Sequence, residues 1–414
     1  MRIAVLSHYF WPEPGAPSAR LLEMSREWAA RGHEVTVVTN FPNHPTGVVP
    51  PAYRGRAFLI EHTQGLRVIR CRTYATPNRG FLKRTLGHLV FMFEAVWQAT
   101  RHLRGTDVLV ASSPTLFSVV AALAISRRLK VPYVFEVRDL WPAIFVELGV
   151  IRNRLVIAAL ERLELALYRR AAAVVAVTHA FADDIAGRGI DRAKLHVIPN
   201  GVDLESFRPE PDEPALRARL GLGDKLVVLY CGAHGISHAL GRILEVAARL
   251  QSESGIHFLF VGEGAEKDAL VARARELALA NVTFLASVPR EEVAAHYRAS
   301  DVCLVPLRAV PLFRAFIPSK MFEILACGRP VVASLEGEAA RILEASGAAL
   351  VVPPEDVDAI AAAVTRLAAD PGLRATLAAR GRPFVAERFD RKRLAARYLE
   401  LLEAAVRATP GAAL

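Results

Sequence analysis

Short apolar runs alternate with amphipathic stretches along the whole chain. In the first half these runs predict strands at residues 2–7, 34–38, 66–72, 107–111, 132–136, 173–177 and 195–198. The second half repeats the rhythm with predicted strands at 226–231, 257–261, 282–285, 302–305, 331–333 and 349–352. Helical patterns lie between them, among others at 18–31, 82–104, 116–128, 152–170 and 180–188. Short apolar strands that alternate with helices predict an α/β fold with mostly parallel sheets covered on both faces.

Two α/β halves are separated by a proline-rich acidic segment at 199–214, which predicts a hinge or linker. A chain of 414 residues exceeds one ordinary core, so two domains are expected. Such sheets bind ligands at the carboxyl ends of their strands. Two facing domains would form a cleft with a donor on one wall and an acceptor on the other.

Composition narrows the class of protein. Apolar residues make up 52% of the chain, which supports buried sheets. The four cysteines form no Cys-x-x-Cys pair, which argues against a zinc site and fits a reducing compartment. Residues 108–126 carry no charge, but Ser-Ser-Pro at 112–114 predicts strand, turn and helix there instead of a membrane span.

The net charge of +10 is concentrated in the first half. Residues 52–104 contain 10 basic and 2 acidic residues, which favours an anionic partner such as a membrane surface or a phosphorylated acceptor. The helix expected within 79–97 combines basic and aromatic residues and could lie in a membrane interface. A helix packed on its own sheet, with a solvated basic surface, would give the same pattern.

Residues 317–332 read as a loop, a short helix, a glycine stop and a buried strand. Lys320 and Glu323 are three residues apart and share a face near the start of that helix. Its unpaired N–H groups and partial positive charge, together with Lys320, suit a diphosphate. Glu323 can accept hydrogen bonds from a ribose. The pattern favours a nucleotide-sugar donor, although a capped amphipathic helix would look alike.

Three other loops follow predicted strands. In the loop at 11–20, Gly15 allows close approach of a ligand and Ser18 can cap the next helix. That loop has neither a G-x-G-x-x-G nor a P-loop pattern, which disfavours a dinucleotide enzyme or an ATPase. Arg138 and Asp139 end another strand; Arg138 could pair with phosphate and Asp139 could orient an acceptor, or the two could form a structural pair.

The third loop, at 230–241, is rich in glycine. Gly232 is expected to turn its backbone N–H toward phosphate oxygens. His234 and His238 lack an accompanying H-E-x-x-H glutamate, so hydrogen bonds to donor phosphates or sugar fit better than a metal. Glu263, in Val-Gly-Glu-Gly at 261–264, is either a donor contact or a first-turn acid.

These pieces together resemble the retaining glycosyltransferases of family 4, which have the two-domain GT-B architecture. The matching segments are 11–20, 30–38, 137–142, 198–203, 261–264 and 318–332. Each is weak alone, but their order and spacing are specific. The segments Asp-Leu-Trp-Pro at 139–142 and Pro-Ser-Lys-Met-Phe-Glu at 318–323 are similar to a bacterial subgroup that transfers amino sugars, such as N-acetylfucosamine, in capsule and O-antigen synthesis.

The resemblance implies two Rossmann-like domains, 1–207 for the acceptor and 208–388 for the donor, with a helix at 389–414 crossing back to the first. It implies a donor that is a nucleotide diphosphate sugar, with UDP expected ahead of other nucleotides. The acceptor would be a saccharide or a polyprenyl-diphosphate-linked saccharide. No cofactor, metal or nucleic-acid partner is expected. The place of action would be the cytoplasm, at the inner face of the membrane.

By the same resemblance, Lys320 would hold the diphosphate and Glu323 the ribose hydroxyls. The backbone of Phe316, Ile317 and Ser319 would meet sugar and phosphate, and Asn200 would also serve donor binding. Lys320, Asp139 and Arg138 form the candidate catalytic set. A nucleotide-sugar 2-epimerase and a non-catalytic, membrane-associated saccharide-binding module are the alternatives.

Three positions depart from the family pattern. The first of two family glutamates is Ala315 here, so sugar recognition by that carboxylate is absent or supplied elsewhere. An Arg and a Lys common in the glycine-rich turn are missing near His234 and His238. Many family members have a His-Asp pair in the first domain where this chain has Arg138-Asp139. The role of that histidine therefore cannot be assigned to Arg138.

Overall fold

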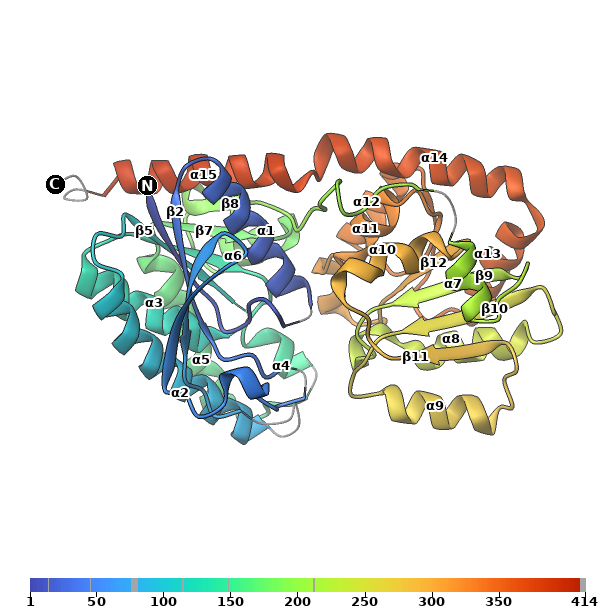
Figure 1. Ribbon diagram of the computed structural model, residues 1–414, viewed down its shortest axis with the longest axis horizontal. Helices are drawn as coiled ribbons and strands as arrows, with labels where there is room; N and C mark the ends of the chain where they lie inside the picture. Colours follow the sequence, from blue (N-terminus) through green and yellow to red (C-terminus); the bar gives the residue numbers. More distant parts are fainter. Residues whose placement is uncertain are drawn as a thin grey trace. The chain divides into compact units, whose positions relative to one another are not determined.

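The computed structural model describes residues 1–13, 15–44, 46–75, 81–113, 115–147, 149–210 and 213–409, without the side chains of 81, 82 and 84 (Figure 1). It divides into two compact units, Met1–Asn200 with Arg391–Leu414, and Gly201–Asp390. The predicted boundaries stood at 207/208 and 388/389. Residues 201–207 belong to the second unit because Arg382 donates to the carbonyl oxygens of Leu204 and Phe207, at 3.0 and 2.8 Å.

The first unit contains a parallel sheet with one antiparallel edge. Its strands are β1 (Arg2–Leu6), β2 (Glu34–Asn40), β3 (Phe58–Thr63), β4 (Leu66–Cys71), β5 (Val108–Ser112), β6 (Tyr133–Val137), β7 (Ala173–Ala176) and β8 (Leu195–Val197). The described strands follow the order β3-β4-β2-β1-β5-β6-β7-β8. Only the pair β3 and β4 is antiparallel among them.

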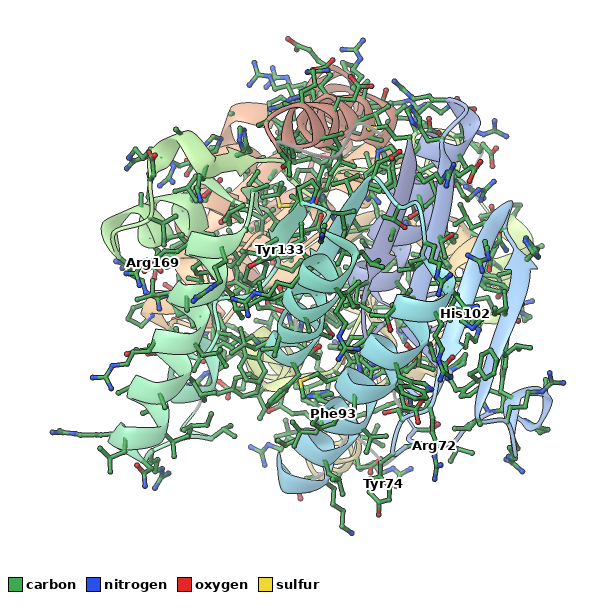
Figure 2. The ribbon with its side chains drawn as sticks, turned by 90° about the vertical axis from the view of Figure 1, so that its left-hand side faces the viewer. Arg72, Tyr74, Phe93, His102, Tyr133 and Arg169 are labelled. Atoms are coloured by element: carbon green, nitrogen blue, oxygen red, sulfur yellow. The ribbon has the colours of Figure 1, made fainter. Side chains whose placement is uncertain are left out.

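Helices cover both faces of this sheet. They are α1 (Ala16–Ala30), α2 (Phe81–His102), α3 (Leu116–Leu129), α4 (Ala143–Glu147), α5 (Arg154–Arg170), α6 (His179–Gly187) and α15 (Arg391–Arg407), with short 3₁₀ helices η1 (Pro51–Tyr53) and η2 (Arg192–Lys194). On one face α15 packs on α1, where Trp28 Nε1 donates to the Ala395 carbonyl oxygen at 3.0 Å. On the other face α2, α3 and α5 lie side by side (Figure 2).

The second unit repeats the design with a smaller sheet. Its strands are β9 (Leu226–Cys231), β10 (Ile256–Val261), β11 (Val282–Leu285), β12 (Val302–Pro306), β13 (Val331–Ser334) and β14 (Ala349–Val352), in the order β11-β10-β9-β12-β13-β14. Every pairing among these described strands is parallel. The carboxyl ends of the strands therefore meet at one edge of the sheet.

The helices of the second unit again lie on both sides of the sheet (Figure 1). They are α7 (Pro214–Arg219), α8 (Leu240–Arg249), α9 (Lys267–Glu276), α10 (Arg290–Arg298), α11 (Lys320–Ala326), α12 (Glu338–Ser346), α13 (Val357–Ala369) and α14 (Pro371–Arg388), with 3₁₀ helices η3 (Ile236–His238) and η4 (Pro311–Ala315). The contacts of α8 and α13 with each other, and of α11 and α12 with α14, build the two covering layers.

The α/β prediction and its parallel sheets are confirmed. The uncharged run at 108–126 is divided into β5 and α3, as expected, and none of the helices within the described ranges has the length and apolarity to span a bilayer. Sequence reasoning missed β3, whose apolar run is only Phe58-Leu59-Ile60 and whose faces are both partly exposed. The cysteines Cys71, Cys231, Cys303 and Cys327 are buried free thiols.

Candidate functional site

A buried lysine marks the carboxyl edge of the second sheet. Lys320 opens α11, and its Nζ atom lies 3.7 Å from the centre of the Tyr230 ring in β9. A Cβ atom on Gly232 would lie 2.5 Å from that Nζ atom. Gly232 also has a φ of +147°, which side chains rarely adopt. The backbone conformation favours glycine here, and a side chain would also displace the flexible end of Lys320.

The Nζ atom of Lys320 is shielded from solvent and has no hydrogen-bond acceptor among the described residues, although the residue as a whole stays partly exposed. Burial lowers the pKa of Lys320 to about 8, against the opposing influence of Cys231 and Glu323. A desolvated ammonium group without an acceptor is stabilised by a nearby anion. The buried ammonium group of Lys320 is therefore a candidate anion-binding group.

The loops after β9 and β10 are bonded to each other. The backbone N–H of Gly232 donates to Val261 and that of His234 to Glu263, both at 2.9 Å. A Cβ atom on Gly262 would lie 1.9 Å from the Gly232 carbonyl oxygen, so close packing of the loops requires that glycine. The prediction that the N–H of Gly232 faces a phosphate is wrong, because Val261 already accepts it.

The two histidines of this loop are uncharged near neutral pH. Burial, Lys267 and Lys320 lower the pKa of His234 to about 4, and its ring nitrogens have no hydrogen-bond partner within the described ranges. Burial and Lys320 lower the pKa of His238 to about 3, while its Nδ1 atom lies 3.4 Å from the Pro306 carbonyl oxygen. These side chains can exchange hydrogen bonds with a ligand but cannot neutralise a diphosphate.

Glu263 stands in an ion pair. Its Oε1 atom lies 2.6 Å from the Nζ atom of Lys267, which also donates to the carbonyl oxygens of Gly262 and Leu285 at 2.9 and 2.8 Å. This lysine fastens the loop after β10 to the end of β11. Contact of Glu263 with a donor stays a prediction. No cluster of potential metal ligands occurs in the part of the chain that the structure describes.

Glu323 lies one turn into α11, and its carboxylate is held by two donors. Arg290 donates to its Oε1 atom at 2.9 Å, and the Tyr297 hydroxyl donates to its Oε2 atom at 3.2 Å. Each carboxylate oxygen keeps a second lone pair for a ligand. The guanidinium of Arg290 lies 5.1 Å from the Phe207 ring. Sequence reasoning missed Arg290 and Tyr297, which belong to α10 and carry no local motif.

The segment before α11 follows η4, which ends at Ala315. Phe316 donates its N–H to the Phe313 carbonyl oxygen at 3.1 Å, Ile317 is buried, and Ser319 is the N-cap residue of α11. These residues thus lie directly before Lys320. Beside Ala315, the charged side chains of Arg314 and Glu336 form an exposed ion pair at 2.7 Å.

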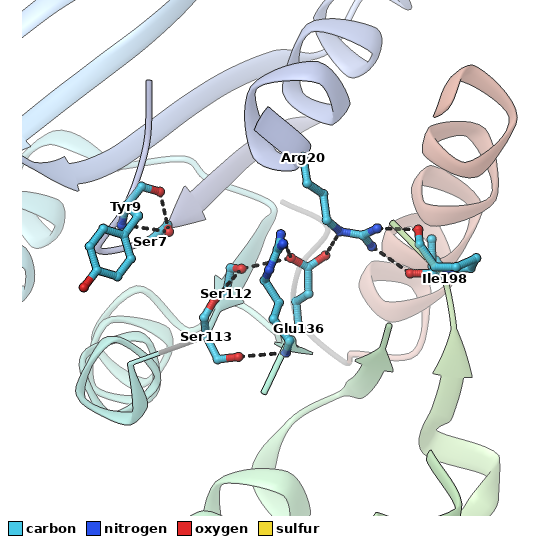
Figure 3. A network of polar contacts seen from close by, with 9 residues as sticks. Ser7, Tyr9, Arg20, Ser112, Ser113, Glu136 and Ile198 are labelled. Carbon is cyan, nitrogen blue, oxygen red and sulfur yellow. Dashed lines mark hydrogen bonds and ion pairs between the residues drawn. The ribbon is translucent and has the colours of Figure 1, made fainter. Parts of the chain in front are cut away.

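In the first unit, a buried carboxylate organises the carboxyl edge of the sheet (Figure 3). Glu136 at the end of β6 accepts from Arg20 Nε at 3.0 Å through Oε2, and from Ser112 Oγ at 2.9 Å through Oε1. Although burial opposes it, Arg20 and Arg138 hold the pKa of Glu136 below its ordinary value. Arg20 also donates to the carbonyl oxygens of Ile198 and Pro199.

Arg138 is the second cation of this cluster. Its Nη1 atom lies 3.9 Å from Glu136 Oε1, and both Nε and Nη1 are buried without a hydrogen-bond partner among the described residues. Its own N–H donates to Ser113 Oγ at 2.8 Å, which fixes the backbone. Burial lowers the pKa of Arg138 to about 10, against Glu136, and burial raises the pKa of the adjacent Asp139, against Arg138.

In the loop after β1, the prediction that Ser18 caps the next helix is wrong, and sequence reasoning missed Glu13. Helix α1 begins after Gly15 (φ +115°), so Ser18 lies inside the helix, buried, and does not cap it. Glu13 is buried, its Oε1 atom accepts from the N–H groups of Asn43 and His44 at 2.8 and 2.9 Å, and burial raises its pKa to about 7. The position of Glu13 between Pro12 and Pro14 was the feature of the sequence that could have identified it.

Asn200, predicted on the donor side, is the last residue of the first unit before the linker. It follows the carbonyl groups that Arg20 binds. The donor candidates Lys320 and Glu323 belong to the second unit, and a role of Asn200 in donor binding stays a prediction.

Two family descriptions match the chain. Residues 15–201 match "Glycosyl transferase 4-like domain" and residues 225–370 match "Glycosyl transferases group 1". The D-inositol 3-phosphate glycosyltransferase of Kineococcus radiotolerans is 30% identical over 419 residues, covering 92% of this chain and 90% of that protein. The chain belongs to this family of glycosyltransferases.

Further similarities agree with this assignment. A putative colanic acid biosynthesis glycosyl transferase, WcaI of Escherichia coli K12, is 26% identical and covers 88% of this chain and 91% of its own. The structure of HepE from Anabaena in complex with UDP and glucose superposes with a TM-score of 0.75 at 20% identity, covering 98% of this chain and 100% of that chain. The fold is thus GT-B, and the prediction of a glycosyltransferase is confirmed.

Proposed function

We propose that this glycosyltransferase moves a sugar from a nucleotide diphosphate donor, UDP-linked, to a saccharide or lipid-linked saccharide in cell-surface polysaccharide synthesis. The observation that carries the donor assignment is the buried, acceptor-free Nζ atom of Lys320, three residues before a carboxylate held in place by Arg290 and Tyr297. The lone pairs that remain on the two Glu323 carboxylate oxygens can accept hydrogen bonds from ribose hydroxyls. HepE is described in complex with UDP and glucose, which supports testing UDP-linked donors first.

The residues of the second unit suggest how leaving-group departure is assisted. Negative charge develops on the diphosphate as the glycosidic bond breaks, and a preorganised cation lowers the energy of that state. Lys320 supplies this charge, while neutral His234 and His238 donate or accept hydrogen bonds without repelling it. We further propose that the anomeric configuration is retained and that the sugar is an N-acetylated hexosamine or deoxyhexosamine.

The direct test is a product assay with UDP-sugars, in the presence and in the absence of a diphosphate-linked saccharide acceptor. We expect UDP release and a new glycoside only when the acceptor is present. The anomeric proton coupling of the product reports retention or inversion. Absence of a glycoside with every nucleotide sugar and acceptor pair would contradict the proposal. The variant Lys225→Ala, a lysine of the same unit before β9, is the matched control for Lys320→Ala.

A membrane-bound acceptor requires the enzyme to reach a lipid surface. Helix α2 exposes Leu86, Phe93 and Trp97 by 48, 68 and 54%, and Arg101 lies over the Trp97 ring at 3.7 Å. Figure 2 displays Phe93 on this outer face, together with the exposed Tyr74. Aromatic side chains flanked by cations are typical of interfacial helices, so we propose that this face contacts anionic lipid.

Vesicle flotation tests the membrane contact. We expect the protein to float with anionic vesicles and not with zwitterionic ones, because residues 52–104 are strongly basic. Phe93→Ser with Trp97→Ser should reduce flotation, whereas Ile236→Ser, an equally exposed apolar residue of the second unit, should not. Equal flotation of all three proteins would contradict the assignment.

A further inference from the structure

Two arginines share one buried carboxylate in the first unit, and only one of them is satisfied. Arg20 uses Nε for Glu136 and its two terminal nitrogens for the carbonyl oxygens of Pro199 and Ile198. Arg138 reaches the same carboxylate only at 3.9 Å. Glu136 cannot approach it more closely because Arg20 and Ser112 already bind its two oxygens.

The charges around Arg138 do not supply the missing partner. Arg391, at the start of α15 and paired with Glu23 of α1 at 2.8 Å, is itself a cation and cannot accept a hydrogen bond from Arg138. Asp139 follows Arg138 directly, but burial raises the pKa of that carboxyl and disfavours its charged form. The Nε and Nη1 atoms of Arg138 therefore remain without a hydrogen-bond acceptor among the described residues, in a side chain that is only 5% exposed.

An unsatisfied buried guanidinium is unfavourable, and a protein keeps one where a ligand completes it. Arg138 follows the last residue of β6, at the edge of the parallel sheet where α/β proteins bind ligands. Its Nε and Nη1 atoms each keep an unused N–H donor on a permanently charged group, which suits the anionic oxygens of a phosphate group. A neutral sugar hydroxyl would leave the charge uncompensated.

We infer that Arg138 binds a phosphate group of the acceptor and selects acceptors that carry one. The inference rests on the proposed function and deepens it, since it names the acceptor chemistry read by the first unit. Arg138 binds through Nε and Nη1 while Ser113 holds its backbone and Glu136 balances the charge of Arg20. The residue acts in recognition, and no covalent step is assigned to it.

The kinetic test compares two acceptors that share one saccharide, the first ending in a polyprenyl-type diphosphate and the second in a neutral alkyl group. In Arg138→Gln we expect KM for the diphosphate acceptor to rise roughly tenfold to a hundredfold, the loss of one charge-assisted pair. KM for the neutral acceptor and the affinity for UDP should change less than about twofold. Arg138→Lys should restore part of the discrimination, since it keeps the charge but loses the separate guanidinium donors.

A binding test separates this inference from the donor assignment. Inorganic pyrophosphate is added to the full-length Lys320→Ala protein, in which the donor cation is removed, and thermal stabilisation is measured. We expect stabilisation that disappears in the double variant Lys320→Ala with Arg138→Gln. Unchanged acceptor discrimination in Arg138→Gln, or a loss of UDP affinity as large as the loss for the acceptor, would overturn the inference while leaving the transferase assignment intact.

Discussion

Each unit has, at the carboxyl edge of its parallel sheet, a buried cationic group without an acceptor among the described residues, and these two groups differ in chemistry. Lys320 lies against the Tyr230 ring with a pKa of about 8, whereas Arg138 lies near Glu136 with a pKa of about 10. Lys320 can lose its proton in the working range of an enzyme, and Arg138 cannot. The comparison suggests a donor site that responds to pH and an acceptor site with a permanent charge.

The largest expected effect is on turnover in Lys320→Ala. Removing the only charge that we assign to the leaving diphosphate should lower kcat/KM by about a thousandfold, in the range of a lost electrostatic stabiliser of a transition state. The melting temperature should not fall, because the folded state no longer buries an unpaired ammonium group. Steady-state kinetics and calorimetry measure both, with Lys225→Ala as control. A variant with normal turnover would remove the basis of the comparison.

The second effect contrasts the two arginines of the first unit. Arg20→Met should destabilise the fold by about 3–5 kcal/mol, because Glu136 loses its main partner inside the protein. Arg138→Met should leave the free energy of unfolding unchanged or raise it, since it removes an unsatisfied charge. Chemical denaturation measures both variants. If Arg138→Met were as destabilising as Arg20→Met, Arg138 would be a structural residue.

The third effect concerns the space that Lys320 occupies. Gly232→Ala places a Cβ atom 2.5 Å from the Nζ atom in a backbone conformation that alanine disfavours. We expect a loss of about 1–3 kcal/mol in stability and a weaker affinity for UDP, because the lysine must move. Gly235→Ala, where a Cβ atom meets nothing within 4 Å, is the matched control. Unaltered UDP binding in Gly232→Ala would show that the position of Nζ is unimportant.

The fourth effect is the pH dependence of donor affinity. Below the Lys320 pKa of about 8 the ammonium group is present, and above it the group is lost unless the diphosphate keeps it protonated. Affinity for UDP should therefore be level below pH 8 and fall about tenfold per pH unit well above it. Lys320→Arg should abolish this decline. The decline should not appear in the KM of the phosphate-bearing acceptor if Arg138 binds it.

The smallest effect is expected at Glu263. Its ion pair with Lys267 is partly exposed, and such pairs contribute about 0–1 kcal/mol. Glu263→Gln should change the melting temperature and kcat little, in contrast to Glu323→Gln, which removes the carboxylate held by Arg290 and Tyr297. A large loss of UDP-sugar affinity in Glu263→Gln would instead identify this residue as a donor contact.

Local patterns predicted most of the elements correctly. The strand at 226–231 matches β9 residue for residue, and the helix at 116–128 matches α3 to within one residue. The misses have physical causes. Strand β3 is an antiparallel edge with mixed exposure. Helix α1 starts at Ala16, after Gly15, with a proline in its first turn, so the Ser18 hydroxyl is inside the helix.

Hydrophobic period and turn chemistry act over a few residues, so they set the order of the elements, the parallel α/β class, the position of Lys320 at the start of its helix and that of Arg138 after its strand. Only the tertiary structure decided which charges are satisfied. Arg20 reaches Glu136 across 116 positions and Arg290 reaches Glu323 across 33. Such pairings depend on how distant strands and helices pack, and packing leaves Arg138 and Lys320 buried with no acceptor from the described residues.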